Sequence, residues 1–77
     1  MADKSSFEVR ADEMLREGAK RVGPGEVVKL RPGYTVTILT GYGAWDEAKG
    51  RLVCTGQVDT DNKIQAKDAR KNCEGRV

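Results

Sequence analysis

The stretch GEVVKLRPGYTVTILT, residues 25–40, contains the clearest strand signal of the chain. Two short runs within it, GEVVKL and YTVTILT, are rich in the β-branched side chains that favour strands. Between them the chain reads Arg31, Pro32, Gly33, which supplies the proline and the glycine of a type II turn. The sequence therefore predicts a β-hairpin. One face of its second strand carries Tyr34, Val36 and Ile38, and we expect this face to look toward a helix.

An amphipathic helix from Phe7 to Val22 is predicted upstream of the hairpin. Its start is marked by SSFE, where Ser5 and Glu8 have the spacing of a capping box, and its end by GPG at residues 23–25. The apolar side chains that share one of its faces are Phe7, Ala11, Met14, Leu15, Ala19 and Val22. We expect this face to cover the sheet, and the alternative is that it docks a partner.

A third strand is predicted over RLVCTGQV, residues 51–58. Apolar side chains fall on both of its faces, which indicates a curled sheet with Gly56 at a bulge or sharp bend. The next residues, DTDNK at 59–63, form a turn-forming cluster. Three alternatives stay open beyond it: a short fourth strand over residues 63–66, a helix capped by Gly75, or a frayed tail.

Together these elements predict an α+β fold. The N-terminal amphipathic helix is expected to pack on a small curled antiparallel sheet of three to four strands, with an SH3-like or similar small barrel as an alternative form. A chain of 77 residues is short enough to form one small domain with a limited core. We therefore expect a single domain over residues 1–77, with frayed ends at residues 1–5 and 75–77.

Composition and charge leave the class of partner open. Charged residues make up 34% of the chain and the net charge is only +2, far from the basicity of a dedicated nucleic-acid binder. The first residues, MADKSS, lack the apolar core of a secretory signal, and no apolar stretch is long enough to span a bilayer. We therefore expect a cytoplasmic protein with no membrane partner. In the cytoplasm Cys54 and Cys73 are expected to be half-buried thiols, and a disulfide between them is the alternative outside the cytosol.

The chain contains no histidine, which excludes Ser-His, Cys-His and His-metal constellations within it. The segment GYGAWD begins like a dinucleotide-binding motif, but Asp46 stands in place of the third glycine. The segment DTDN begins like a calcium loop but lacks the glycine and the final glutamate of that motif. We therefore expect a protein that is not an enzyme and that needs no cofactor and no metal.

The remaining candidate site is the segment GYGAWDEAKG, residues 41–50, together with the arginine that follows it. Tyrosine and tryptophan are enriched in binding hot spots, and charged neighbours can form a polar rim around them. The candidate partner-binding residues are Tyr42, Trp45, Asp46, Glu47, Lys49 and Arg51. We expect Trp45 to be half-buried and Tyr42 to be exposed.

These residues predict a small non-enzymatic protein-interaction module. It is expected to occlude or bridge a larger protein partner, as a phage or plasmid accessory factor does. The alternative is a small nucleic-acid-binding β-barrel, in which basic side chains flank the hairpins and aromatic faces stack on bases.

Overall fold

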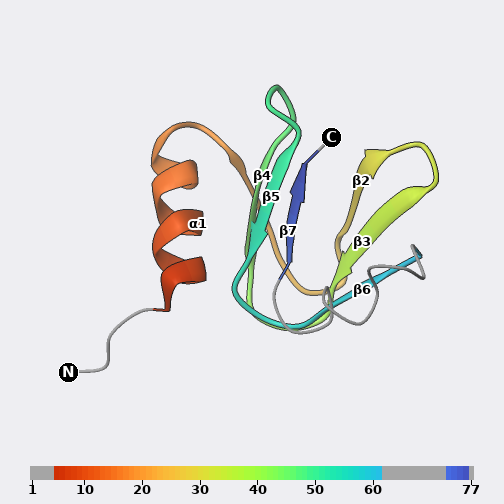
Figure 1. The fold of residues 1–77 in the computed structure, drawn as a ribbon. Helices are drawn as coiled ribbons and strands as arrows, with labels where there is room; N and C mark the ends of the chain where they lie inside the picture. Colours follow the sequence, from red (N-terminus) through yellow and green to blue (C-terminus); the bar gives the residue numbers. More distant parts are fainter. Residues whose placement is uncertain (1–4, 62–72, 77) are drawn as a thin grey trace.

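The computed structural model describes residues 5–61 and 73–76 as one helix and seven strands arranged in three layers (Figure 1). Helix α1 packs on a four-stranded antiparallel sheet with the strand order β1-β4-β5-β7. The other face of that sheet packs on a three-stranded antiparallel sheet with the order β2-β3-β6. The elements are α1 (Ser6–Arg16), β1 (Lys20–Val22), β2 (Val27–Arg31), β3 (Tyr34–Ile38), β4 (Gly43–Asp46), β5 (Arg51–Cys54), β6 (Val58–Thr60) and β7 (Glu74–Arg76).

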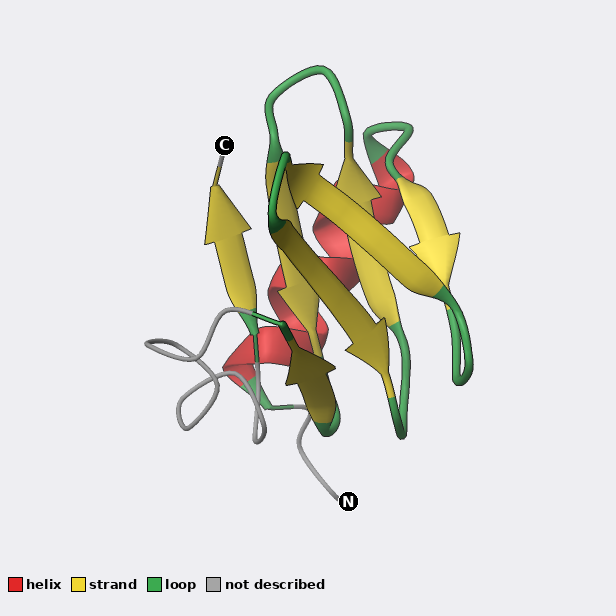
Figure 2. Cartoon of the chain, turned by 90° about the vertical axis from the view of Figure 1, so that its right-hand side faces the viewer, coloured by secondary structure: helices red, strands yellow, loops and turns green. Residues whose placement is uncertain are grey.

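The predicted α+β class, with an N-terminal helix on an antiparallel sheet, is confirmed, but the single curled sheet is not. In the described residues there are two sheets, and neither closes on itself into a barrel. Figure 2 shows the three-stranded sheet in front of the four-stranded one, with the helix behind both. The apolar residues on both faces of β5 have a different cause from curling: Val53 packs in the helix layer, whereas Leu52 and Cys54 pack between the sheets.

Helix α1 starts where the sequence predicts and ends six residues earlier than expected. Ser5 is the N-cap, and its Oγ accepts a hydrogen bond from the backbone N–H of Glu8 at 3.2 Å. At the other end Gly18 adopts a φ of 105°, a conformation that favours glycine. The N–H of Ala19 donates to the carbonyl oxygen of Met14 at 2.9 Å, and that of Gly18 donates to Leu15 at 3.2 Å. This pair of bonds is a Schellman motif, which stops the helix before it reaches the glycines at 23–25.

Residues predicted to form the last turn of the helix instead form β1. Lys20 pairs with Trp45 and Val22 pairs with Gly43, so β1 lies along one side of β4. Val22 is buried between the two sheets and not under the helix. The rest of the predicted helix face does cover the sheet: Ala11 and Met14 are buried, and Phe7, Leu15 and Ala19 pack around them.

The predicted β2–β3 hairpin is confirmed, but the prediction that its buried face packs toward the helix is wrong. Gly33 has a φ of 78°, as the third residue of a type II turn requires. Tyr34, Val36 and Ile38 are buried and alternate with half-exposed threonines. They pack against the four-stranded sheet and not against α1, because the helix occupies the opposite face of that sheet.

Gly56 lies where the chain passes from one sheet to the other, so the predicted bend there is confirmed. A Cβ atom at Gly56 would collide with the carbonyl oxygen of Thr40, which explains why glycine is needed. The predicted strand over 51–58 is therefore two strands, β5 and β6, in different sheets. The start of the predicted turn at 59–63 is also wrong, because Asp59 and Thr60 belong to β6 and pair with β3.

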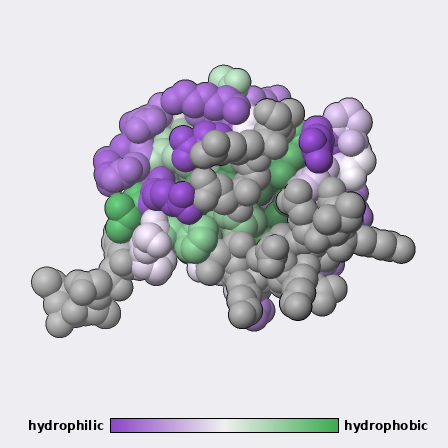
Figure 3. All heavy atoms as spheres, in the orientation of Figure 1, coloured by the Kyte–Doolittle hydropathy of each residue, from purple (hydrophilic) through white to green (hydrophobic). Residues whose placement is uncertain are grey.

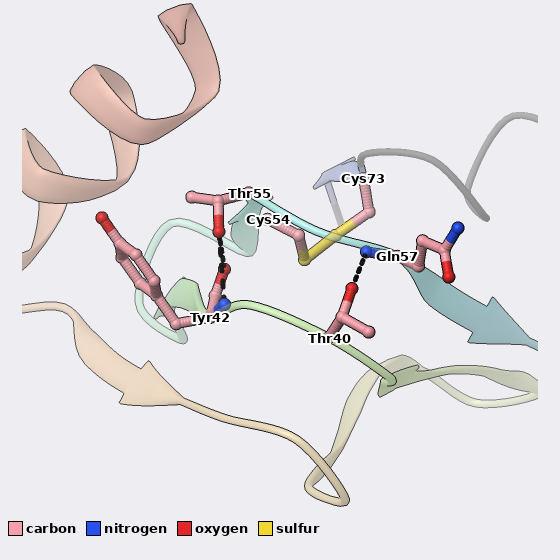
Figure 4. The surroundings of a disulfide bond; sticks show 6 residues. All are labelled: Thr40, Tyr42, Cys54, Thr55, Gln57 and Cys73. Atoms are coloured by element: carbon pink, nitrogen blue, oxygen red, sulfur yellow. Dashed lines mark hydrogen bonds between the residues drawn. A yellow bond between two sulfur atoms is a disulfide. The ribbon is translucent and has the colours of Figure 1, made fainter. Parts of the chain in front are cut away.

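The C-terminal end forms β7, which pairs with β5. Gly75 and Arg76, expected to be frayed, are part of this strand. The alternatives for residues 63–66 lie outside the described residues. Cys54 and Cys73 form a disulfide with a Cα–Cα distance of 5.0 Å, so the expectation of two thiols is wrong (Figure 4).

No helix in the described part of the chain combines the length and the apolar character needed to cross a membrane.

Candidate functional site

The β4–β5 hairpin holds most of the predicted partner-binding residues at one end of the molecule. Its two strands pair in register, with Trp45 opposite Leu52 and Asp46 opposite Arg51. The Oδ1 atom of Asp46 accepts a hydrogen bond from the N–H of Lys49 at 3.2 Å and stabilises the turn between the strands. Figure 1 shows this turn at the top of the view, extending beyond the neighbouring strands. The hairpin therefore presents its turn to solvent on a rigid two-stranded support.

Trp45 lies in a strand of the four-stranded sheet and not in a displayed loop. It faces the space between the two sheets, where it packs against the buried core and stays half-buried, as expected. Lys20 of β1 is its cross-strand neighbour on one side and Leu52 of β5 on the other. Cross-strand partners share a face of the sheet, so the exposed Lys20 lies beside the tryptophan.

Tyr42 lies on the opposite face, under the helix, and is half-buried where the sequence predicted exposure. Its hydroxyl donates a hydrogen bond to Oδ1 of Asp12 at 2.6 Å. The guanidinium carbon of Arg21 lies 4.3 Å from the centre of its ring, which is cation–π geometry. The hydrogen bond to Asp12 raises the pKa of Tyr42, and desolvation and the negative charges of Asp12 and Glu8 act in the same direction. Tyr42 thus connects α1 to the sheet.

Arg51 is half-buried at the base of the hairpin turn. Its Nε atom is buried, and within residues 5–61 and 73–76 it has no hydrogen-bond partner. A buried donor without an acceptor carries a desolvation cost.

We call the end of the molecule that contains Lys20, Trp45, Asp46, Glu47, Lys49 and Arg51 the hairpin end. Glu47 and Lys49 are exposed in its turn, and hydrophilic residues dominate the upper edge of the molecule in Figure 3. The structure brings five of the six predicted residues to this end of the β4–β5 hairpin. Strand alternation puts the Asp46–Arg51 pair on the helix-side face of the sheet, as it does Tyr42, whereas Trp45 lies on the opposite face. Lys20 is the residue that sequence reasoning missed, since it was placed at the end of a helix. The glycine at position 18 was the available signal for an earlier stop.

The outer face of the three-stranded sheet is a second exposed surface (Figure 2). Val27 and Leu39 are 61% and 48% exposed there. Thr37 is the cross-strand partner of Val27 on this sheet. Directly after β6 the carboxylate of Asp61 accepts a hydrogen bond from the N–H of Thr35 at 2.7 Å, which lowers the pKa of Asp61. Apolar area on this face is limited to scattered side chains, which are common on soluble proteins.

The β2 edge of that sheet has features that discourage pairing with another strand. Lys29 is exposed along it, and the register with β3 shifts between Lys29 and Arg31. Charged side chains and local irregularities of this kind protect natural sheet edges from adding a further strand. The hairpin end therefore remains the better candidate for a binding surface.

No group of three or more potential metal ligands occurs among residues 5–61 and 73–76. Glu47 and Lys49 are exposed in the turn between β4 and β5. Comparisons of the chain with protein-family models, with curated proteins and with solved structures found no match in any of the three.

Proposed function

We propose that this protein is a small non-enzymatic interaction module that contacts a larger protein through its hairpin end. The observation that carries the proposal is the position of Trp45. It is half-buried, so its ring is held by the core while part of it stays accessible beside an exposed turn. An aromatic side chain that is already ordered loses little conformational entropy when a partner covers it, which is why such residues act as anchors.

The residues around Trp45 indicate which chemical groups a partner surface would provide. Lys20 contributes positive charge on the face of the sheet that carries Trp45, and Lys49 contributes it in the adjacent turn. Asp46 is occupied by the turn, which leaves Glu47 as the acidic group of the rim. A partner surface with an apolar pocket for the indole and carboxylates for the ammonium groups of Lys20 and Lys49 would complement this arrangement.

The test is a matched pair of double variants. Glu47→Ala with Lys49→Ala removes both exposed charges of the turn and keeps the backbone hydrogen bond from Lys49 to Asp46. Glu13→Ala with Arg16→Ala removes the same two kinds of charge from exposed positions on α1. Alanine is favourable in helices and neutral in this turn, so neither pair should unfold the chain.

The tagged chain and both variants are used to capture proteins from an extract of the native cell, and the affinity for the captured protein is then measured with purified components. We expect one stoichiometric protein partner, about tenfold weaker binding by the turn variant, and unchanged binding by the helix variant. Equal binding by all three chains would contradict the assignment of the hairpin end. Recovery of nucleic acid alone, with salt-sensitive affinity, would favour the nucleic-acid alternative.

We also propose that the isolated chain does not turn over a substrate. A broad screen of hydrolase and transferase substrates with purified protein is expected to show no activity. Activity that persists through purification and is abolished by a single substitution of a described side chain would overturn this part of the proposal.

A further inference from the structure

β7 is a short strand at one edge of the four-stranded sheet, and its residue types provide little to hold it there. It spans Glu74–Arg76 and pairs with β5 at three positions. Two of its residues are charged types and the third is glycine, so none of them is apolar. Burial of apolar area is the main stabilising contribution for a strand on a sheet, and three paired residues without it are marginally stable. Another contact must keep β7 in place.

Cys73, the residue directly before β7, makes that contact. It is disulfide-bonded to Cys54, the last residue of β5, and its carbonyl oxygen accepts a hydrogen bond from the Cys54 N–H at 3.0 Å. Cys73 is only 5% exposed and packs in the core between the two sheets, while Cys54 is fully buried. Figure 4 shows the bond joining the two strands at the point where β7 begins. Cys73 is therefore a core residue that directly precedes β7 in the sequence.

We infer that the Cys54–Cys73 disulfide is a redox-dependent covalent link that holds β7 on the edge of β5. Reduction by a dithiol breaks the Sγ–Sγ bond in two successive exchange steps. The dithiol loses two electrons and two protons as it closes into its own disulfide, and each cysteine sulfur gains one electron and one proton. The two cysteines are then separate thiols, and β7 has no covalent link to β5.

Release of β7 changes which backbone groups the sheet presents. Successive N–H groups of an antiparallel strand point to opposite neighbours. The N–H of Cys54 points toward β7, whereas that of Thr55 points the other way and donates to the carbonyl oxygen of Tyr42 at 2.9 Å. Loss of β7 therefore frees the amide of Cys54 and leaves that of Thr55 bonded. The chain would present a paired sheet edge in an oxidising compartment and an open edge in the reducing cytoplasm.

The test compares amide hydrogen exchange of the full-length chain with and without a dithiol reductant, followed by NMR. We expect exchange at Cys54 to accelerate about tenfold or more on reduction, while exchange at Thr55 in the same chain changes little. The variant carrying both Cys54→Ala and Cys73→Ala serves as the control, since its exchange should not respond to the reductant. Equal acceleration of both amides would mean general loosening, and no acceleration would mean that β7 stays bound; either result overturns the inference.

A second measurement on the reduced wild-type chain does not depend on any variant folding. Iodoacetamide alkylates a thiolate by forming a sulfur–carbon bond and releasing iodide, and it does so only where the sulfur is accessible. If β7 is released, Cys73 leaves the core with it while Cys54 remains in β5. Brief alkylation should then modify Cys73 about tenfold faster than Cys54, as measured by mass spectrometry. Equal rates at the two cysteines, or protection of both, would overturn the inference.

Discussion

The two faces of the sheet at β4 each carry an aromatic residue, and the two residues have different surroundings. Tyr42, just before the strand, and Trp45, within it, are three residues apart and therefore lie on opposite sides of the sheet. The tyrosine hydroxyl and ring both have partners in Asp12 and Arg21. The tryptophan packs one part of its ring on the core and keeps the rest accessible. The comparison shows that an aromatic residue becomes available to a partner through the face on which it lies and not through its type.

The layers behind the two faces also differ. The helix layer is built around small residues of the sheet, Ala44 and Val53, which let α1 approach closely. The layer between the sheets contains most of the larger aliphatic side chains, such as Ile38 and Leu52. Buried apolar area stabilises a fold roughly in proportion to its amount, so the layer between the sheets should contribute more to stability than the helix layer.

The largest expected effect tests this difference between the layers. Leu52→Ala should lower the free energy of unfolding by about 3 kcal/mol, because it leaves a cavity in the core between the sheets. Met14→Ala should cost about 2 kcal/mol, because a helix packed on small residues can move to fill part of the space. Urea unfolding followed by circular dichroism measures both. A larger loss for the Met14 variant would reverse the order of the two layers.

Trp45→Ala comes next in expected size. Since the indole is half-buried, its removal should cost about 2 kcal/mol of unfolding free energy, below the value typical of a fully buried aromatic. Binding to the captured partner should weaken as well. Trp45→Phe is the matched control, expected to retain most of the stability while losing part of the affinity. Full stability of the alanine variant would show that the ring does not contribute to the core.

Tyr42→Phe removes only the hydroxyl that reaches Asp12 and should cost about 1 kcal/mol. The raised pKa of Tyr42 gives this contribution a pH dependence. The folded state holds the phenol proton more tightly than the unfolded state, so the contribution is fully present below the unfolded pKa of about 10 and is lost as the pH rises through the folded pKa. The difference between wild type and variant, measured by urea unfolding, should therefore stay constant up to about pH 10 and shrink above it. A difference that stays constant above that pH as well would show that the hydrogen bond does not persist in solution.

The smallest expected effect on stability is that of Glu47→Ala with Lys49→Ala. Both side chains are exposed in the hairpin turn, and the backbone bond that stabilises the turn remains. Stability should change by no more than about 0.5 kcal/mol, as for most surface substitutions. Thermal unfolding checks this. A loss of several degrees would mean that any binding defect of the same variant reflects unfolding and not the loss of a contact.

Local signals in the sequence predicted local structure well. The capping residues at the start of α1, the proline-glycine turn of the β2–β3 hairpin and the bend at Gly56 are confirmed, because each depends on neighbouring backbone groups or on a conformation that glycine favours. The same reasoning missed the early end of α1, since Gly18 was passed over in favour of the glycines at 23–25. That error also hid β1 and the place of Lys20 beside Trp45.

The arrangement of the candidate partner-binding residues could be predicted from the sequence only in part. Residues close in sequence to a hairpin turn stay close in space, so Trp45, Asp46 and Arg51 lie at the same end of the hairpin, although Trp45 faces the other side of the sheet. The assignment of Tyr42 to the same surface required knowledge of which face α1 covers. That choice depends on contacts between segments about thirty residues apart, as in the hydrogen bond from Tyr42 to Asp12, and no local pattern specifies them.

The sequence by itself determined the α+β class, the start of the helix, the hairpin and the residue types at the exposed turn, because these follow from backbone conformation and hydrophobic period over a few residues. The tertiary structure decided that β5 is buried on both faces, that the strands divide into two sheets, and that Cys54 meets Cys73. These outcomes depend on which apolar surfaces cover one another. An apolar side chain has no preferred direction of burial, so its partner emerges only when the whole chain packs.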